Sequence, residues 1–163
     1  MTTAPSGAPL NIANGVREFA RATPDAVAVI DGDRRPAYRQ LPERAARLAQ
    51  SLTGRGLTAG SRVAVCLGNR LEHPEIACGI AMAGMTMVPL NPRYTAAEAT
   101  FILEHSESAA VIADAALAAV VAPAVAAGAL IALAVGDAEG FESYDEALAA
   151  ATPVDPQVPV DEE

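Results

Sequence analysis

The sequence predicts an α/β fold with a mostly parallel sheet and helices on both faces, built from flavodoxin-like βαβ units. Short apolar runs alternate along the chain with segments of helical period, and this alternation is typical of βαβ units. Several of the runs lack polar alternation, which indicates strands covered on both sides. The 163 residues, 52% of them hydrophobic, fit one domain with a sizeable core.

The first predicted elements precede the sheet. Residues 1–10 are expected to be disordered, and Asn11 can cap a helix that ends before Pro24. One face of that helix carries Ile12, Val16, Phe19 and Ala20. Residues 26–38 then predict a hairpin, because two short extended runs flank an Asp-Gly-Asp turn.

The central part of the chain alternates helices and strands. Apolar residues recur with a helical period from Leu41 to Leu52, and a glycine turn then leads to a uniformly apolar run at 62–67. That run is predicted to be a central strand. Thr95 and Glu98 form a capping box that opens another helix. The remaining predictions here are a helix at 74–83 and strands at 86–90 and 109–113.

Residues 115–136 form 22 consecutive uncharged residues, which is long enough to cross a membrane. Eleven of them are alanine, and aspartates rather than Lys or Arg flank the run. Both features argue against a membrane span. Pro123 and Gly128 are expected to break the run into a short helix, a turn and a strand at 129–135.

Three regions are predicted along the chain. Residues 1–10 form a disordered N-terminus, 11–151 a single α/β unit, and 152–163 an acidic, Pro-rich linker that is exposed. The last predicted helix, at 147–151, is capped by Ser143 with Glu146.

The basic residues exclude several classes of function. The chain has no lysine, which disfavours Walker A phosphate loops, protein kinases and Schiff-base enzymes. All 11 arginines lie in residues 1–93, whereas residues 94–163 carry 13 acids and no base. Nucleic-acid binding is therefore disfavoured, because it requires a basic patch.

The two cysteines, Cys66 and Cys78, lie in apolar runs and predict buried, reduced thiols in a cytoplasmic protein. His73 falls between them, but this spacing matches no common zinc motif and a fourth ligand is missing. A pair of Cys66 as nucleophile and His105 as base is also disfavoured, because burial in a strand raises a thiol pKa.

Four other places are weighed as ligand contacts. The glycine-rich stretch 54–60 follows a helix and precedes a strand, the reverse of a dinucleotide-binding loop, so it predicts a helix end and turn. Turn or cap roles are predicted for Asp31 and Asp114, and exposed ion pairs for Arg34 and Arg35. A ligand contact stays open for Arg93 and Tyr94, in a loop after a buried strand. No catalytic, cofactor-binding or metal-binding residue is assigned.

Several segments together resemble the AMP-dependent synthetase, or adenylate-forming, family. They are Pro-Asp-Ala-Val-Ala-Val-Ile at 24–30, Ala-Tyr-Arg-Gln-Leu at 37–41, Gly-Ser-Arg-Val-Ala-Val at 60–65, Ala-Met-Ala-Gly-Met-Thr-Met-Val-Pro-Leu-Asn-Pro at 81–92, and Ile-Leu-Glu-His-Ser at 102–106. The resemblance covers about residues 11–152 and is greatest to acyl-CoA synthetases, or fatty-acid-CoA ligases. Gly68, and Arg70 with Leu71, depart from the usual pattern.

The resemblance implies an enzyme that activates a carboxylic acid with ATP and transfers the acyl group from an acyl-adenylate to a thiol such as CoA. ATP, Mg²⁺ and CoA are implied for the complete enzyme, and no cofactor for this chain. The family's phosphate loop and catalytic lysine are absent, so the chain is expected to be an inactive N-terminal subdomain, whether a gene fragment, a split subunit or a truncated product. Its implied partner is the remainder of the enzyme, with self-association expected of the isolated chain. A stand-alone binding or scaffolding domain is the alternative.

Overall fold

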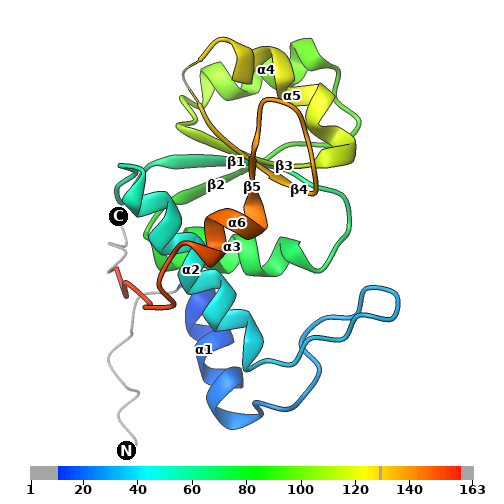
Figure 1. The fold of residues 1–163 in the computed structure, drawn as a ribbon. Coiled ribbons are helices and arrows are strands. Elements are labelled where there is room, and N and C mark those ends of the chain that lie inside the picture. Colours follow the sequence, from blue (N-terminus) through cyan, green and yellow to red (C-terminus); the bar gives the residue numbers. More distant parts are fainter. Residues whose placement is uncertain (1–10, 129, 159–163) are drawn as a thin grey trace, which may run out of the picture.

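A five-stranded parallel sheet forms the centre of the molecule (Figure 1). The computed structural model describes residues 11–128 and 130–158. The strand order is β2-β1-β3-β4-β5, and every neighbouring pair is parallel. The strands are β1 (Arg62–Cys66), β2 (Thr86–Pro89), β3 (Ala110–Asp114), β4 (Ile131–Val135) and β5 (Glu142–Ser143). The predicted α/β fold is confirmed, and the order is the flavodoxin-like one.

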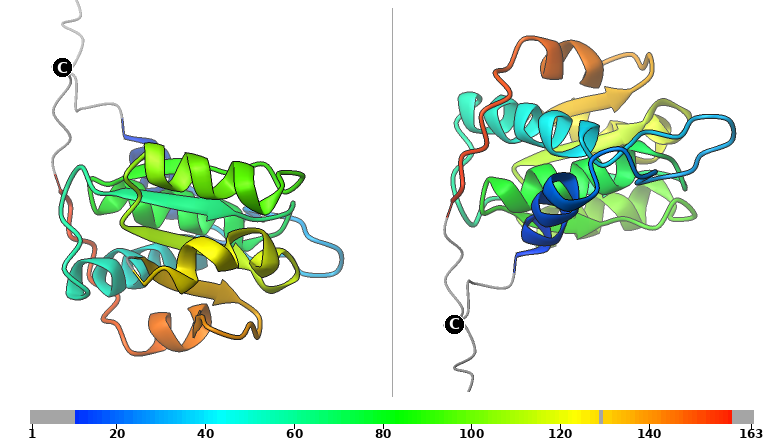
Figure 2. Two further views of the ribbon diagram at one scale, coloured as in Figure 1. Left: turned by 90° about the horizontal axis from the view of Figure 1, so that it is seen from above. Right: turned by 90° about the horizontal axis from the view of Figure 1, so that it is seen from below.

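Helices cover both faces of the sheet, and one face has a further helix packed outside its helical layer (Figures 1 and 2). On one side lie α2 (Gln40–Gly54), α3 (Glu72–Met82) and α6 (Tyr144–Ala149), with α1 (Ile12–Ala22) packed outside α2 and α3. On the other side lie α4 (Ala96–His105), the 3₁₀ turn η1 (Ala115–Leu117) and α5 (Ala118–Ala126). The hairpin at 26–38 projects beside α1, and isolated antiparallel bridges join its two strands.

The helix starts that local sequence signals predict are confirmed. The Asn11 side chain accepts a hydrogen bond from the Ala13 N–H at 2.9 Å and caps α1. Thr95 and Glu98 form the expected reciprocal capping box at α4. Ser143 caps α6 by accepting from the backbone of Glu146. Each of these interactions joins residues no more than three apart, which is why the sequence reveals them.

Several elements differ from the prediction. α3 begins at Glu72, so that Pro74 lies in the first turn, where its missing N–H is not needed. The expected break at Pro123 is wrong: α5 continues through it, with Pro123 and Ala119 both on the solvent side. Water can therefore satisfy the Ala119 carbonyl that Pro123 leaves without a helical donor. The short strand β5 was not predicted, and α6 ends at Ala149.

The two sides of the sheet bury different side chains. Large residues fill the α2/α3/α6 side, among them Leu48, Leu52, Ile76, Ile80, Met82 and Leu148. Small residues dominate the α4/α5 side, among them Ala64, Ala99, Val111, Ala113, Val121, Ala124 and Ala132. The former side also contains the buried carboxylate of Glu75, which accepts hydrogen bonds from Arg44 Nε at 2.7 Å and from the Tyr144 hydroxyl at 2.8 Å.

The segment after α6 returns to the helices outside the sheet. At 152–158, the described part of the predicted linker, Asp155 accepts hydrogen bonds from Arg17 Nε at 2.6 Å and Nη2 at 2.8 Å. The predicted disordered residues 1–10 and the linker end at 159–163 lie outside the described residues. Within the described part of the chain, no helix has both the length and the apolar character that a membrane crossing requires.

Candidate functional site

The carboxyl edge of the sheet, between β1 and β3, is the candidate functional site. After β1 the chain passes through α3 to β2 on one side, whereas β3 lies on the other side of β1 and continues to α5 on the opposite face. The loops that leave β1 and β3 therefore diverge. Open α/β sheets place their ligands at such a switch point.

Arg70 bridges the two diverging loops. It lies between β1 and α3, and its Nη1 atom is 2.9 Å from Oδ2 of Asp114, the last residue of β3. Its Nε atom donates to Glu72 Oε2 at 2.7 Å. Asp114 also accepts from the N–H of Ala116 at 3.1 Å, and so caps η1. One guanidinium thus holds the end of β3 and the start of α3 together.

The tip of the hairpin joins the same cluster. Arg34 Nη1 donates to Glu72 Oε1 at 3.1 Å, and Arg34 also pairs with Asp31 across the hairpin turn. Asp31 in turn accepts from the Leu71 N–H at 3.2 Å. Burial opposes ionisation of Glu72, but the hydrogen bonds from Arg70 and Arg34 outweigh it and hold the Glu72 pKa below its usual value. Glu72 is therefore an ionised carboxylate at neutral pH.

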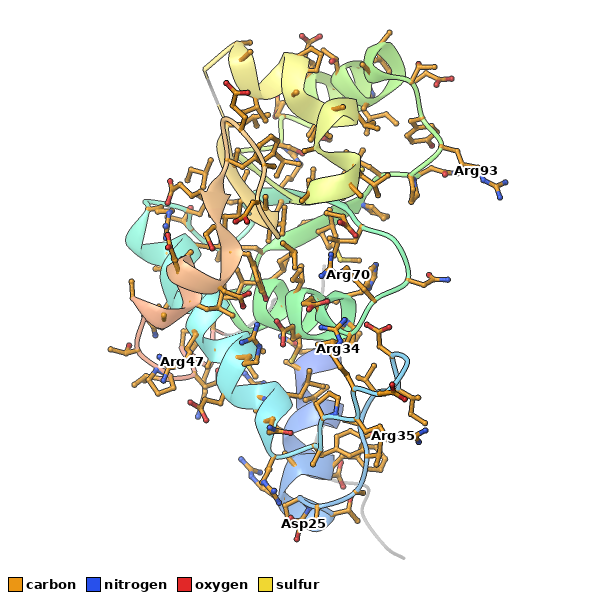
Figure 3. All side chains as sticks on the ribbon, turned by 45° about the vertical axis from the view of Figure 1, so that its right-hand side comes forward. Asp25, Arg34, Arg35, Arg47, Arg70 and Arg93 are labelled. Carbon is orange, nitrogen blue, oxygen red and sulfur yellow. The ribbon has the colours of Figure 1, made fainter. Side chains whose placement is uncertain are left out.

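A shallow cleft of about 350 Å³ lies beside this cluster. Its lining residues are Val29, Ile30, Asp31, Asn69, Arg70 and His73. Figure 3 shows Arg70 and Arg34 on this side of the molecule, near the end of the sheet. The carboxylates of Asp31, Glu72 and Asp114 each pair with an arginine, so the arrangement is suited to fixing three loops relative to one another.

The predicted cysteine and histidine candidates fall in separate places. Cys66 and Cys78 are buried free thiols, and burial raises the pKa of Cys66 and raises that of Cys78 to about 11. His73 lines the cleft, whereas His105 stacks on the exposed ring of Phe101 on α4. Among residues 11–128 and 130–158, no three His, Cys, Asp or Glu side chains are grouped to hold a metal ion.

The predicted turn roles agree with the geometry. Gly54 ends α2, and Gly60, with φ of +81°, donates from its N–H to the Gly84 carbonyl at 2.8 Å. The stretch 54–60 is thus a helix end and turn. Arg35 and Arg93 both point away from the body of the molecule, and Arg34 does more than the predicted surface ion pair because it also binds Glu72 (Figure 3).

The residues that join the cluster were missed at the level of sequence. No sequence pattern predicts a role for Arg70 or Glu72, whereas Asp31 and Asp114 are predicted as turn or cap residues. Arg34 and Glu72 are 38 residues apart, and Arg70 and Asp114 are 44 apart by number, so no local spacing signals either contact. The available signal was limited to an acidic first turn at Glu72 and Glu75, which stabilises any helix start.

Comparison with known proteins gives the family. The family model described as "AMP-binding enzyme" matches residues 16–163, nearly the whole chain. The chain belongs to the AMP-binding enzyme family. The chain spans only about a fifth of the length of the curated ligases that it matches: 19% of a relative from Mycobacterium marinum and 21% of one from Rhodococcus jostii.

These relatives are CoA ligases. The Rhodococcus jostii protein, a propanoyl:CoA ligase whose acyl group carries a dioxo-octahydroindenyl ring, is 38% identical over 112 residues, or 69% of this chain. The Mycobacterium marinum protein is a medium/long-chain-fatty-acid and 3-oxocholest-4-en-26-oate CoA ligase, and is 36% identical over 103 residues, or 63% of this chain.

Solved structures give the same fold. A benzoate CoA ligase from Burkholderia xenovorans has a TM-score of 0.81 at 26% identity, covering 88% of this chain and 29% of its own. The Mycobacterium tuberculosis fatty acyl CoA synthetase has a TM-score of 0.77 at 33% identity, covering 90% of this chain and 29% of its own. The chain therefore corresponds to one part of a much larger enzyme fold.

Proposed function

We propose that these 163 residues form the N-terminal α/β unit of an acyl-CoA synthetase-like enzyme. The complete enzyme activates a hydrophobic carboxylic acid with ATP to an acyl-adenylate and passes the acyl group to a thiol such as CoA. The observation that carries the proposal is the family match over residues 16–163, together with relatives that are CoA ligases. The relatives' names supply the substrate class, since fatty, steroid-like and ring-bearing acids share an apolar body.

The residues of the candidate site do not fit ATP with Mg²⁺. Every carboxylate of the cluster is engaged by Arg34 or Arg70, so a metal ion would have to displace an ion pair. The stretch 54–60 follows a helix, whereas a phosphate-binding loop opens one. In this proposal the residues of the cluster contribute positioning and packing to the enzyme, and no catalytic step.

The thiols suit the proposed setting in the cytoplasm. Cys66 and Cys78 are both free and buried, so they neither require nor form a disulfide. Free buried thiols are common in proteins of reducing compartments. The ATP, Mg²⁺ and CoA sites belong, in this proposal, to the parts of the enzyme that these residues do not include.

Two assays of pyrophosphate exchange and acyl-CoA formation test the proposal. The isolated chain is expected to show no carboxylate-dependent exchange of pyrophosphate into ATP above a no-protein control. Residues 11–158 are then grafted in place of the matching segment of the Mycobacterium tuberculosis fatty acyl CoA synthetase. This chimera is expected to form acyl-CoA, whereas the host enzyme without the segment is not.

Two results would contradict the proposal. Exchange by the isolated chain would show that it contains a self-sufficient adenylation site. A chimera that folds, by its circular dichroism and size, yet makes no acyl-adenylate with any fatty or aromatic acid would favour a stand-alone binding domain instead.

A further inference from the structure

An apolar cleft lies at the outer edge of the sheet. β5 ends the strand order, next to β4, so its other side is a free edge of the described sheet. Figure 2 shows β4 (gold) and α6 (orange) at this end of the sheet. A cleft of about 500 Å³ opens here, and we call it the edge cleft. Its lining residues are Val125, Leu130, Ile131, Ala132, Gly140, Phe141 and Glu142.

The edge cleft forms because β5 is shorter than β4. β4 begins at Ile131, whereas its pairing with β5 begins at Leu133, opposite Glu142. Gly140, with φ of +82°, lies in the turn just before β5, and a φ of this sign favours glycine. The amino end of β4 therefore has one open side. The candidate functional site lies at the other end of the parallel strands, where β1 and β3 terminate.

A backbone donor of β4 points into the edge cleft. The Ile131 N–H donates to the Ala109 carbonyl oxygen at 3.1 Å, on the β3 side. Backbone N–H groups alternate between the two sides of a strand, so the Ala132 N–H points to the outer side. The pairing with β5 begins one residue later and gives this N–H no acceptor. Because Ala132 is 7% exposed and an unpaired buried N–H costs free energy, the position favours the carbonyl oxygen of an added strand.

The α5 side of the edge cleft is apolar. Val125, Leu130 and Phe141 pack against the buried residues of the α4/α5 layer, yet each is only half-buried. In an added strand, alternate side chains would face this apolar wall. In β-strand addition, main-chain hydrogen bonds provide affinity and clefts for alternate side chains provide specificity. The wall therefore suits an apolar side chain on every second residue of a docked segment.

The α6 side of the same edge is acidic. Glu142 of β5 and Glu146 of α6 line a second cleft, of about 370 Å³. Asp137 and Glu139, in the loop before β5, line a third cleft of about 390 Å³ together with Glu146. Arg55 is the only base among the described residues that line these clefts, and it already pairs with Glu142 at 2.6 Å. The exposed carboxylates on this side therefore favour basic side chains on the alternate residues of a docked segment.

Charge decides between the possible occupants. A second copy docked edge to edge would bring two sets of these carboxylates together, which like-charge repulsion opposes. An anionic ligand such as a fatty acid would meet the same carboxylates. Residues 94–163, which supply the strands and loops of this edge, contain 13 acids and no base. An extended segment with alternating apolar and basic residues suits the Ala132 N–H, the apolar wall and the acidic side at once.

We infer that the edge cleft is a docking site for an extended segment of another protein that alternates apolar and basic residues. The segment lies outside β4 as an added strand, and one of its carbonyl oxygens accepts from the Ala132 N–H. Its apolar side chains fill the space between Val125 and Phe141. Its basic side chains face Glu142 and Glu146. Because the site lies at the amino ends of the strands, a partner can dock without covering the candidate functional site.

The test uses a synthetic peptide with the sequence Thr-Arg-Leu-Arg-Val-Arg-Thr, blocked at both ends and carrying a fluorescent label. Its binding to the 163-residue chain is measured by fluorescence anisotropy, and amide exchange of Ala132 is followed by NMR. We expect exchange at Ala132 to slow roughly tenfold or more at saturation, because the N–H gains an acceptor. Three matched peptides should bind roughly tenfold or more weakly: one with Glu for Arg, one with Ser for Leu and Val, and one with the apolar and basic residues in separate blocks.

Paired variants of the protein locate the site. Phe141→Ser removes part of the apolar wall and should weaken binding roughly tenfold, whereas Phe101→Ser, on the exposed side of α4, should leave it unchanged. Glu146→Gln should weaken binding roughly threefold and reduce its dependence on salt, whereas Glu104→Gln on α4 should do neither. Circular dichroism and the thermal midpoint check the fold of each variant. The peptide series uses the parent protein, so it stays decisive if a variant unfolds.

Four results would overturn the inference. The first is no binding of the alternating peptide at about 1 mM, or binding that leaves the exchange of Ala132 unchanged. The second is equal binding of the acidic peptide. The third is the formation of concentration-dependent dimers that Phe141→Ser abolishes, which would assign the edge cleft to a second copy. The fourth is binding to the isolated chain but not to the folded chimera described above, which would assign the edge cleft to the rest of the enzyme. None of these results depends on whether the chimera makes acyl-CoA, so the inference is tested separately from the proposed function.

Discussion

The two helical layers of this protein are stabilised in different ways. The α2/α3/α6 layer combines large buried side chains with a buried ionic group, in which Glu75 is 3% exposed and accepts from Arg44 and Tyr144. The α4/α5 layer relies on alanine and valine packing. The comparison shows where geometry is specified tightly: a buried carboxylate tolerates few arrangements, whereas small apolar residues tolerate many.

The largest expected effect comes from removing one partner of the buried group. Arg44→Ala leaves the Glu75 carboxylate buried with only the Tyr144 hydroxyl as a partner, and should lower the free energy of unfolding by about 3–5 kcal/mol. Urea denaturation followed by circular dichroism measures this. The double variant Arg44→Ala with Glu75→Gln should recover part of the loss, because the uncompensated charge is gone. An unchanged midpoint for Arg44→Ala would show that the carboxylate is hydrated.

The next effect tests how closely α2 and α3 approach. A Cβ atom on Gly79 would lie 2.7 Å from the Ala45 carbonyl oxygen and 3.0 Å from the Leu48 Cβ atom. Gly79→Ala should therefore destabilise the protein by about 1–3 kcal/mol, despite the better helix propensity of alanine. Gly15→Ala in α1 is the matched control, since nothing lies within 4 Å of its added Cβ. The control should stabilise by about 0.5–1 kcal/mol. If Gly79→Ala stabilises the protein as Gly15→Ala does, then α2 and α3 can move apart at little cost in free energy.

These contacts also show the limit of the sequence as a predictor. The capping residues Asn11, Thr95 and Ser143 were foreseen, because a cap acts within one turn of helix. The contact between Glu75 and Tyr144 joins residues 69 apart, and nothing in their local sequence marks it. The parallel sheet followed from the alternation of strands and helices, but the side chains that fix α6 against α2 and α3 did not.

In the candidate site too, the local roles of residues could be predicted from the sequence and the long-range contacts could not. Asp31 and Asp114 were correctly placed in a turn and a cap from their neighbours alone, whereas their connection through Arg34, Glu72 and Arg70 depends on the fold bringing three loops together. The predicted apolar face of α1 is divided in the structure, because Val16 packs against the core whereas Ile12 and Phe19 are exposed. Hydrophobic periodicity identifies an apolar face without showing which of its residues the fold covers.

A smaller effect is expected on the α4/α5 layer. Pro123 interrupts one hydrogen bond of α5 on its solvent side, so Pro123→Ala restores a donor without changing the core. The variant should be more stable by about 1–2 kcal/mol, part of the intrinsic helix penalty of proline being offset by its effect on the unfolded chain. Thermal unfolding measures this. A loss of stability would show that Pro123 fixes the start of the turn at Gly128, and that this layer is more tightly specified than its small side chains indicate.

The smallest expected effect concerns the clasp between Arg17 and Asp155. Burial opposes ionisation of Asp155, but the hydrogen bonds from Arg17 and from the Gln157 backbone prevail and hold the Asp155 pKa below its usual value. A carboxyl whose pKa is lower in the folded state contributes stability above its unfolded pKa of about 3.9, and that contribution is lost as the pH falls through the folded value. Asp155→Asn should therefore cost about 1 kcal/mol at pH 7, and the difference from the parent protein should shrink steadily between pH 5 and pH 2.

Thermal midpoints of the parent protein and Asp155→Asn across that pH range test the clasp, with Asp145→Asn as the control. Asp145 is largely exposed and pairs with Arg44, which keeps Glu75 as its other partner. A difference between the parent protein and Asp155→Asn that stays constant from pH 7 to pH 2 would mean that Asp155 acts through packing rather than charge. Because the clasp holds the segment after α6 against α1, its loss in the chimera should also speed proteolysis after residue 151 while leaving the sheet intact. Faster cleavage with an unchanged sheet would show that the segment after α6 depends on the single ion pair between Arg17 and Asp155. The α2/α3/α6 layer would then be stabilised independently, by the buried Glu75 and its partners.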